Sequence, residues 1–114
     1  VGRHLADKAV SEHAIRVRAW PVAINPGYLY AFLSLADYGY GQIIRTAYGT
    51  SIPSLSVDEM PQILVPLAGT SDQLDIGSDV MLAVELRDEA NDLEDEAQRI
   101  LSAALGFASQ EADR

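Results

Sequence analysis

Polar and aromatic side chains of the types that contact nucleic acids are concentrated between residues 38 and 51. Tyrosine, glutamine and arginine stack on bases or bond to base edges, whereas hydroxyls and backbone amides donate to phosphate oxygens. Together with two arginines of an earlier segment, the candidate DNA-contacting residues are Arg16, Arg18, Tyr38, Tyr40, Gln42, Arg45, Thr50 and Ser51. The structural alternative is that the tyrosines line the edge of the core and that Arg45 pairs with a nearby acid.

Other polar residues do not indicate catalysis or metal binding. His4 and His13 are the only histidines, and neither has a second ligand at a helical spacing. The string from Asn25 to Tyr28 resembles the Asn-Pro-Pro-aromatic motif with which amino-methyltransferases hold an amine, but Gly27 replaces the second proline. Asn25 and Pro26 instead suit the start of a helix. We therefore expect no enzyme activity, no metal and no cofactor.

Composition limits the class of protein further. The 114 residues are enough for one domain with an appendage, and they contain no cysteine. Without a signal peptide or an apolar run of about 18 residues, a cytoplasmic protein outside the membrane is expected. The chain begins at Val1 without an initiator methionine, which is compatible with its being part of a longer polypeptide.

The net charge of −9 is unevenly distributed. Residues 1–60 carry five basic and five acidic side chains, whereas residues 61–114 carry three arginines and twelve carboxylates. Most of these carboxylates lie in the C-terminal helical pattern. The N-terminal part is therefore free to contact phosphate, and the C-terminal part is not.

The apolar spacing and the turn and capping residues along the chain predict an α+β fold. Alternating residues in Ala9–Trp20 predict a strand, and the apolar run Ile63–Leu67 predicts a buried strand. Asn25 and Pro26 predict a helix start, followed by an apolar face that extends to Ala36. The remaining segments are expected as follows: a loop with a short helical turn in Gly39–Gly49, a short extended segment in Ser51–Ser56, a turn in Asp58–Pro61 and a long helix in Ser71–Phe107.

The long helix has a seven-residue repeat of small and large apolar side chains. The expected helix-pairing residues are Ala83, Leu86, Ala90, Leu93, Ala97, Ile100, Ala104 and Phe107. A 3-4 spacing of this kind is a coiled-coil seam, and alanine at each first position allows close approach of a partner backbone. Glu89 and Glu96 lie on one flank and Glu94 on the other, so a parallel twin in register would bring like charges together. The seam therefore predicts an antiparallel or a different helix as its partner.

These patterns divide the chain into three parts. Residues 1–70 form a small mixed globule of short strands and helices, residues 71–108 form a coiled-coil helix, and residues 109–114 form a disordered tail. No internal repeat is present.

The order of several strings resembles the specificity subunit of type I restriction-modification systems. The strings are Pro26-Gly27-Tyr28-Leu29-Tyr30-Ala31-Phe32-Leu33, then Gly49-Thr50-Ser51-Ile52-Pro53-Ser54-Leu55-Ser56, then Ile63-Leu64-Val65-Pro66-Leu67, then a long helix. Gln73 and Ile76 match family positions before that helix. The chain departs from the family pattern at Ala68, where a second proline is common, and it is shorter on the N-terminal side than a full target recognition domain.

The resemblance implies a non-catalytic role in sequence-specific recognition of double-stranded DNA. Residues 1–70 would be a partial target recognition domain, and residues 71–108 would be the spacer helix that sets the distance between two half-sites. The implied partners are methyltransferase and restriction subunits and an antiparallel spacer helix from the same or another chain. Cleavage and methyl transfer would belong to the partner subunits, which use S-adenosylmethionine and ATP.

Two other functions are compatible with the sequence. The chain could be an acidic coiled-coil interaction module, or a remnant, without DNA binding. It could also be the recognition region of a fused restriction-methylation enzyme, which predicts the same local chemistry and differs only upstream.

Overall fold

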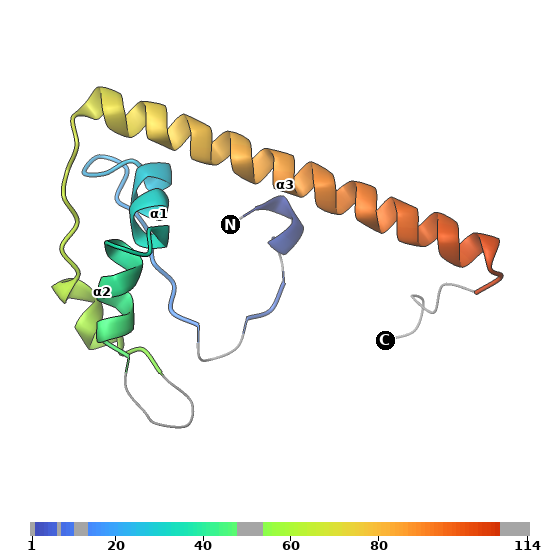
Figure 1. Ribbon diagram of the computed structural model, residues 1–114, viewed down its shortest axis with the longest axis horizontal. Helices are drawn as coiled ribbons and strands as arrows, with labels where there is room; N and C mark the ends of the chain where they lie inside the picture. Colours follow the sequence, from blue (N-terminus) through green and yellow to red (C-terminus); the bar gives the residue numbers. More distant parts are fainter. Residues whose placement is uncertain (1, 7, 11–13, 48–53, 108–114) are drawn as a thin grey trace. The chain divides into compact units, whose positions relative to one another are not determined.

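The computed structural model describes residues 2–6, 8–10, 14–47 and 54–107 (Figure 1). Its elements, in chain order, are the 3-10 helix η1 (Arg3–Leu5), α1 (Pro26–Ser34), α2 (Gly39–Arg45), the 3-10 helix η2 (Val57–Gln62) and α3 (Thr70–Ala104). Of the described residues, 62% are helical and 1% are in strand, and they form no sheet. The prediction of an α+β fold is therefore wrong.

The predicted start of α1 is confirmed. Asn25 is the N-cap, and its side-chain oxygen accepts hydrogen bonds from the backbone N–H of Gly27 at 2.9 Å and of Tyr28 at 3.1 Å. Pro26 occupies the first helical position, where the lack of an N–H leaves no helical bond unmade. Tyr28 and Phe32 of α1 are the buried large apolar side chains of the described residues.

Two glycines allow close approach around α1. A Cβ atom at Gly27 would lie 2.7 Å from the Cα atom of Gly77 in α3, and one at Gly39 would lie 2.4 Å from the carbonyl oxygen of Phe32. Real Cβ atoms do not approach other atoms so closely. The backbones of α1, α2 and the first turns of α3 therefore pack against one another only because these positions lack side chains.

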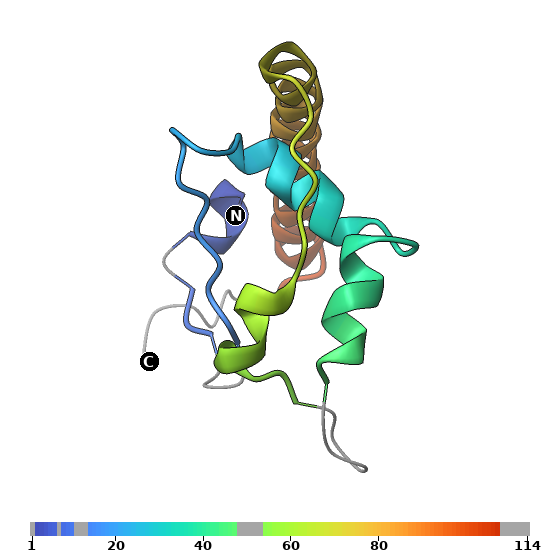
Figure 2. The same ribbon diagram turned by 90° about the vertical axis from the view of Figure 1, so that its left-hand side faces the viewer.

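The two predicted strands are extended or irregular segments instead. Residues 14–20 have no regular secondary structure, and neither do residues 63–67, which connect η2 to α3 in Figure 2. Leu64 is 77% exposed, so this second segment is not a buried strand. Neither segment has a neighbouring strand among the described residues. Side chains of α1 and α2 bond instead to the backbone of residues 63–67, and a side chain of α3 bonds to the carbonyl of Ala68, the next residue.

Three smaller predictions have different outcomes. The expected turn at Asp58–Pro61 lies inside η2, and the expected helical turn in Gly39–Gly49 is α2. Ser54 forms an isolated bridge, whereas residues 51–53 of the expected extended segment lie outside the described residues. The predicted tail at 109–114 also lies outside them.

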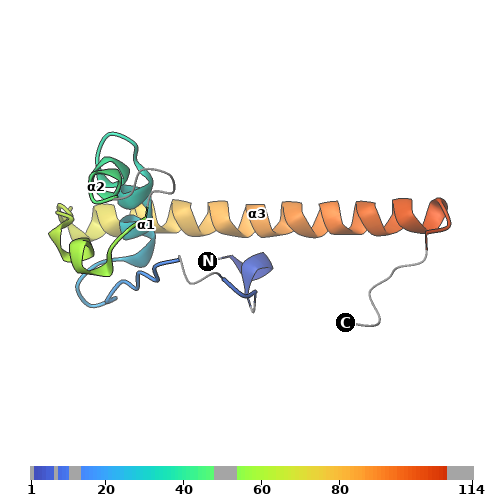
Figure 3. The same ribbon diagram turned by 90° about the horizontal axis from the view of Figure 1, so that it is seen from below.

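The long helix predicted for Ser71–Phe107 is α3, a single unbroken helix in Figure 3. At about 1.5 Å per residue, its 35 residues span roughly 52 Å. None of the helices in the described part of the chain combines the length and apolar composition that a membrane crossing requires.

The chain divides into two compact units, which differ from the expected division at residue 70. One unit consists of Val1–Lys8 with Ala83–Arg114, and the other is Ala9–Leu82. Each unit thus contains part of α3.

Candidate helix-pairing surface on α3

The predicted seam lies on one side of α3 and is exposed along its length. The residues concerned within the helix are Ala83, Leu86, Ala90, Leu93, Ala97, Ile100 and Ala104. Leu93, at the centre, is 72% exposed, and Leu86 and Ile100 are also more than half exposed. The seam therefore has the exposure that a helix-pairing surface requires.

The helix ends just before the last predicted seam residue. Gly106 has φ +72°, its N–H donates to the Ala103 carbonyl at 3.2 Å, and the N–H of Phe107 donates to the Ser102 carbonyl at 2.9 Å. This pair of bonds is the Schellman motif, in which a left-handed glycine ends a helix. Phe107 is exposed but lies beyond the last helical turn, so the helical seam ends at Ala104.

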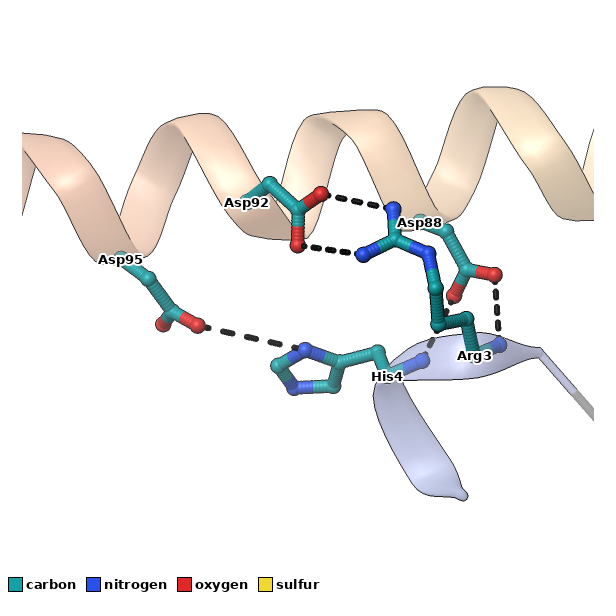
Figure 4. Close-up of polar contacts among 5 residues, drawn as sticks. All are labelled: Arg3, His4, Asp88, Asp92 and Asp95. Atoms are coloured by element: carbon teal, nitrogen blue, oxygen red, sulfur yellow. Dashed lines mark hydrogen bonds and ion pairs between the residues drawn. The ribbon is translucent and has the colours of Figure 1, made fainter.

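The opposite side of α3 binds the N-terminal segment Gly2–Leu5, which we call the clasp (Figure 4). The Asp88 carboxylate accepts hydrogen bonds from the backbone N–H groups of Arg3 at 2.5 Å and His4 at 3.0 Å. Asp88 is only 8% exposed. It lies roughly 140° around the helix from Leu93, five residues away, so the clasp leaves the seam uncovered.

Two side-chain contacts extend the clasp toward the C-terminal end of α3 (Figure 4). The Arg3 guanidinium donates to both carboxylate oxygens of Asp92, at 2.6 Å and 3.4 Å. The Nδ1 atom of His4 lies 4.0 Å from an Asp95 oxygen, an ion pair only when the imidazole is protonated. Asp88, Asp92 and Asp95 follow the helical spacing of four and three residues and therefore form one line along α3.

The charges of the clasp stabilise one another. The hydrogen bonds from the backbone N–H groups of His4 and Arg3 lower the pKa of Asp88, because they favour its ionised form. The hydrogen bond to Asp92 and its negative charge raise the pKa of Arg3. A Cβ atom at Gly2 would lie 2.6 Å from an Asp88 oxygen, so a side chain there would displace the carboxylate that accepts the bonds from Arg3 and His4.

Sequence reasoning missed the clasp. In the sequence, the acids of α3 indicate only a part of the chain that does not contact phosphate, and His4 is a candidate only for metal binding. The available signal was the alignment of Asp88, Asp92 and Asp95 on one helical line. Because the sequence separation from Arg3 to Asp88 is 85 residues, that signal did not identify the partner. The described residues contain no cluster of potential metal ligands.

The structure separates the predicted DNA-contacting residues into different environments. Tyr38 and Tyr40 are exposed at the start of α2, and Arg45 is exposed in its last turn. Arg16 and Arg18 are exposed on the irregular segment 14–20. Thr50 and Ser51 lie outside the described residues.

Gln42 has a structural contact that competes with DNA binding. Its Nε2 atom donates to the Leu64 carbonyl at 3.0 Å, and its Oε1 atom accepts from the Leu64 N–H at 2.9 Å. Tyr40 lies two residues earlier and therefore on the other side of α2, at about 200° of helical rotation. The structure thus separates Gln42 from Tyr40 rather than placing them on one surface.

Comparisons of the chain with protein-family models, with curated proteins and with solved structures find no match.

Proposed function

We propose that this chain is a non-catalytic DNA target recognition component of a restriction-modification complex, in which α3 pairs with an antiparallel helix. The observation that carries the proposal is the exposed seam from Ala83 to Ala104, on the side of α3 that the clasp leaves uncovered. The small residues of the seam allow a facing backbone to approach closely, and its large residues supply apolar area to bury. The order of strings that resembles specificity subunits supports the DNA-recognition part of the proposal.

The first test of helix pairing is whether the chain self-associates, with α3 of a second copy serving as the partner helix. We expect Leu93→Glu to convert the assembly to monomers in sedimentation velocity, because it places a charge at the centre of the seam. Met81→Glu is the matched control, since Met81 is also an exposed apolar residue of α3 but lies about 120° around the helix from Leu93. An assembly that persists in Leu93→Glu would rule out the seam.

The orientation is tested by disulfide cross-linking, which the lack of native cysteines makes selective. In an antiparallel pair with Ala90 opposite Leu93, Ala83 faces Ile100. A mixture of Ala83→Cys and Ile100→Cys chains should then form mainly the mixed disulfide, because only close Cβ atoms can be bridged. Predominant Ala83→Cys homodimers would indicate a parallel pair instead.

DNA contact is proposed for the exposed residues of the Ala9–Leu82 unit. These are Tyr38, Tyr40, Arg45, Arg16 and Arg18, whereas the amide of Gln42 already bonds to the Leu64 backbone. Gel shifts should use the complete subunit with its methyltransferase partner. If Arg45 contacts a phosphate, Arg45→Ala weakens binding on all sequences and lowers the salt slope by about one. An unchanged affinity and slope in both Arg45→Ala and Tyr40→Ala would refute this surface.

The second candidate function is an acidic interaction module without DNA binding. The net charge of −9, with its excess on residues 61–114, favours it. Self-association through the seam combined with no DNA affinity in the complete assembly would support this alternative over the first proposal.

A further inference from the structure

The segment Leu64–Ala68, called here the tethered segment, is bonded along one edge by side chains from three helices. Gln42 of α2 bonds to both backbone groups of Leu64. The Tyr28 hydroxyl donates to the Pro66 carbonyl at 2.6 Å, and Gln73 Nε2 donates to the Ala68 carbonyl at 2.8 Å. In an extended chain, the backbone groups of alternate residues point to the same edge. Residues 64, 66 and 68 therefore form the inner edge of this segment.

Val65 and Leu67 form the outer edge of the tethered segment. Within the described part of the chain, no hydrogen bond involves the N–H or the carbonyl of either residue. Pro66 has no N–H to donate, but it lies on the inner edge. The row of hydrogen-bonding groups along the outer edge is therefore not interrupted by proline. The outer edge therefore offers two N–H groups and two carbonyls at the spacing of a β-ladder, which is a template for an added strand.

The segment Ile15–Ala19 has the complementary properties. Its residues alternate between apolar and basic, and its backbone forms no hydrogen bonds with other described residues. Acidic side chains lie just before and just after the tethered segment in sequence, at Asp58, Glu59 and Asp72. A strand that carries Arg16 and Arg18 is therefore opposite in charge to the residues that flank the tethered segment in sequence.

Burial supports the need for such a strand. The buried large apolar side chains of the described residues are Tyr28 and Phe32, whereas Val17 and Leu67 are more than half exposed. So little buried apolar area leaves this unit near the lower limit of stability for an independent domain. Strand addition would cover apolar side chains of both segments.

We propose that the outer edge of the tethered segment accepts a β-strand, and that this strand is Ile15–Ala19 of a second copy of the chain. The Val65 and Leu67 backbone groups then pair with those of the incoming strand, while Gln42, Tyr28 and Gln73 keep the inner edge in place. This contact lies within the Ala9–Leu82 unit and depends neither on the seam of α3 nor on DNA.

The test is amide hydrogen exchange by NMR on the Leu93→Glu chain, in which the seam no longer pairs. The Leu64 amide should exchange slowly at every protein concentration, because Gln42 bonds to it. The Val65 and Leu67 amides should exchange fast in dilute protein and slow by roughly tenfold or more as dimers form, the effect of gaining one hydrogen bond each. Fast exchange at every concentration would overturn the proposal, and slow exchange at every concentration would show that the second copy is not the source of the strand.

Two proline variants of the chain, and two versions of a peptide, identify which segment supplies the added strand. Val17→Pro removes an N–H from Ile15–Ala19 and should abolish the slowing, whereas Val10→Pro, at another exposed valine, should preserve it. A synthetic peptide of residues 14–20 should protect the two amides of the Val17→Pro chain in trans, and the same peptide with proline at Val17 should not. Equal protection in Val17→Pro and Val10→Pro would assign the strand to another segment and refute Ile15–Ala19.

Discussion

The clasp and the tethered segment are both positioned by hydrogen bonds with helix side chains, but the bonding groups differ in charge. Each is a short segment without a strand partner among the described residues, and each is positioned by side chains of helices that bond to its backbone. The tethered segment is bonded by neutral groups, the amides of Gln42 and Gln73 and the hydroxyl of Tyr28. The clasp is bonded by the carboxylates of Asp88 and Asp92. Because only the clasp is held by charged groups, only the clasp depends on pH and salt.

The largest effect is expected where the tethered segment joins α3. Gln73 accepts a bond from the Asn25 N–H at 3.0 Å and donates to the Ala68 carbonyl, and both bonds are partly buried. Gln73→Ala should lower the free energy of unfolding by about 2 kcal/mol, because two backbone groups lose their partners. Urea denaturation measures the change. Gln62→Ala, at an exposed glutamine whose side chain bonds to Glu59 within the described residues, should alter the free energy of unfolding by less than about 0.5 kcal/mol.

Gly2→Ala should release the clasp, because the added Cβ would collide with the Asp88 carboxylate. The amides of Arg3 and His4 should then exchange roughly tenfold faster in NMR measurements, as expected for loss of one hydrogen bond each. Gly69→Ala is the control, since its Cβ would meet Asp72 at an ordinary 3.6 Å. Unchanged exchange at Arg3 and His4 in Gly2→Ala would contradict the close contact.

The clasp should open in acid, whereas the tethered segment should not. Because the pKa of Asp88 is lower in the folded chain than in the unfolded one, the clasp is fully stabilised above the ordinary carboxyl pKa of about 4. This stabilisation is lost as the pH falls through the lowered value. The Arg3 and His4 amide chemical shifts should follow that titration, while the Leu64 amide shift stays constant. In Asp88→Asn the titration at Arg3 and His4 should disappear, and its persistence would show that another acid controls the clasp.

The smallest effect is expected from the ion pair between Arg3 and Asp92, whose side chains are both more than half exposed. Arg3→Ala should accelerate amide exchange at His4 by less than Gly2→Ala does, and high salt should abolish the difference from the unmodified chain. Arg99→Ala controls for the loss of an arginine, because Arg99 pairs with Glu96 within one turn of α3. A salt-independent effect of Arg3→Ala would indicate packing by the Arg3 stem rather than charge.

Local sequence signals predicted the helices well. Asn25 and Pro26 specify the start of α1 through groups only two or three residues away, and the apolar repeat of α3 is visible in sequence because a helix repeats its faces every few residues. The strand predictions failed because alternation in Ala9–Trp20 and an apolar run in Ile63–Leu67 show only that a segment can pair. Whether Ile15–Ala19 and the tethered segment pair depends on which backbone lies beside them.

The candidate surfaces likewise combine features that local sequence predicts with contacts that it does not. Sequence spacing predicted the seam up to Ala104, but the end of α3 required the Schellman motif at Gly106. The sequence analysis also predicted Gln42 as a DNA-contacting residue. Nothing in the type or spacing of Gln42 reveals its bonds to Leu64, 22 residues away.

The cap of α1, the long α3 and its apolar repeat follow from the local sequence, because each depends on residues within one or two helical turns. Long-range packing was needed to show that Arg3 and His4 bond to Asp88 and that three helices bond to the tethered segment, whose outer edge is unpaired among the described residues. These contacts join residues from 5 to 85 positions apart. Most of them depend on how the backbone brings distant segments together, which no local pattern of side chains specifies.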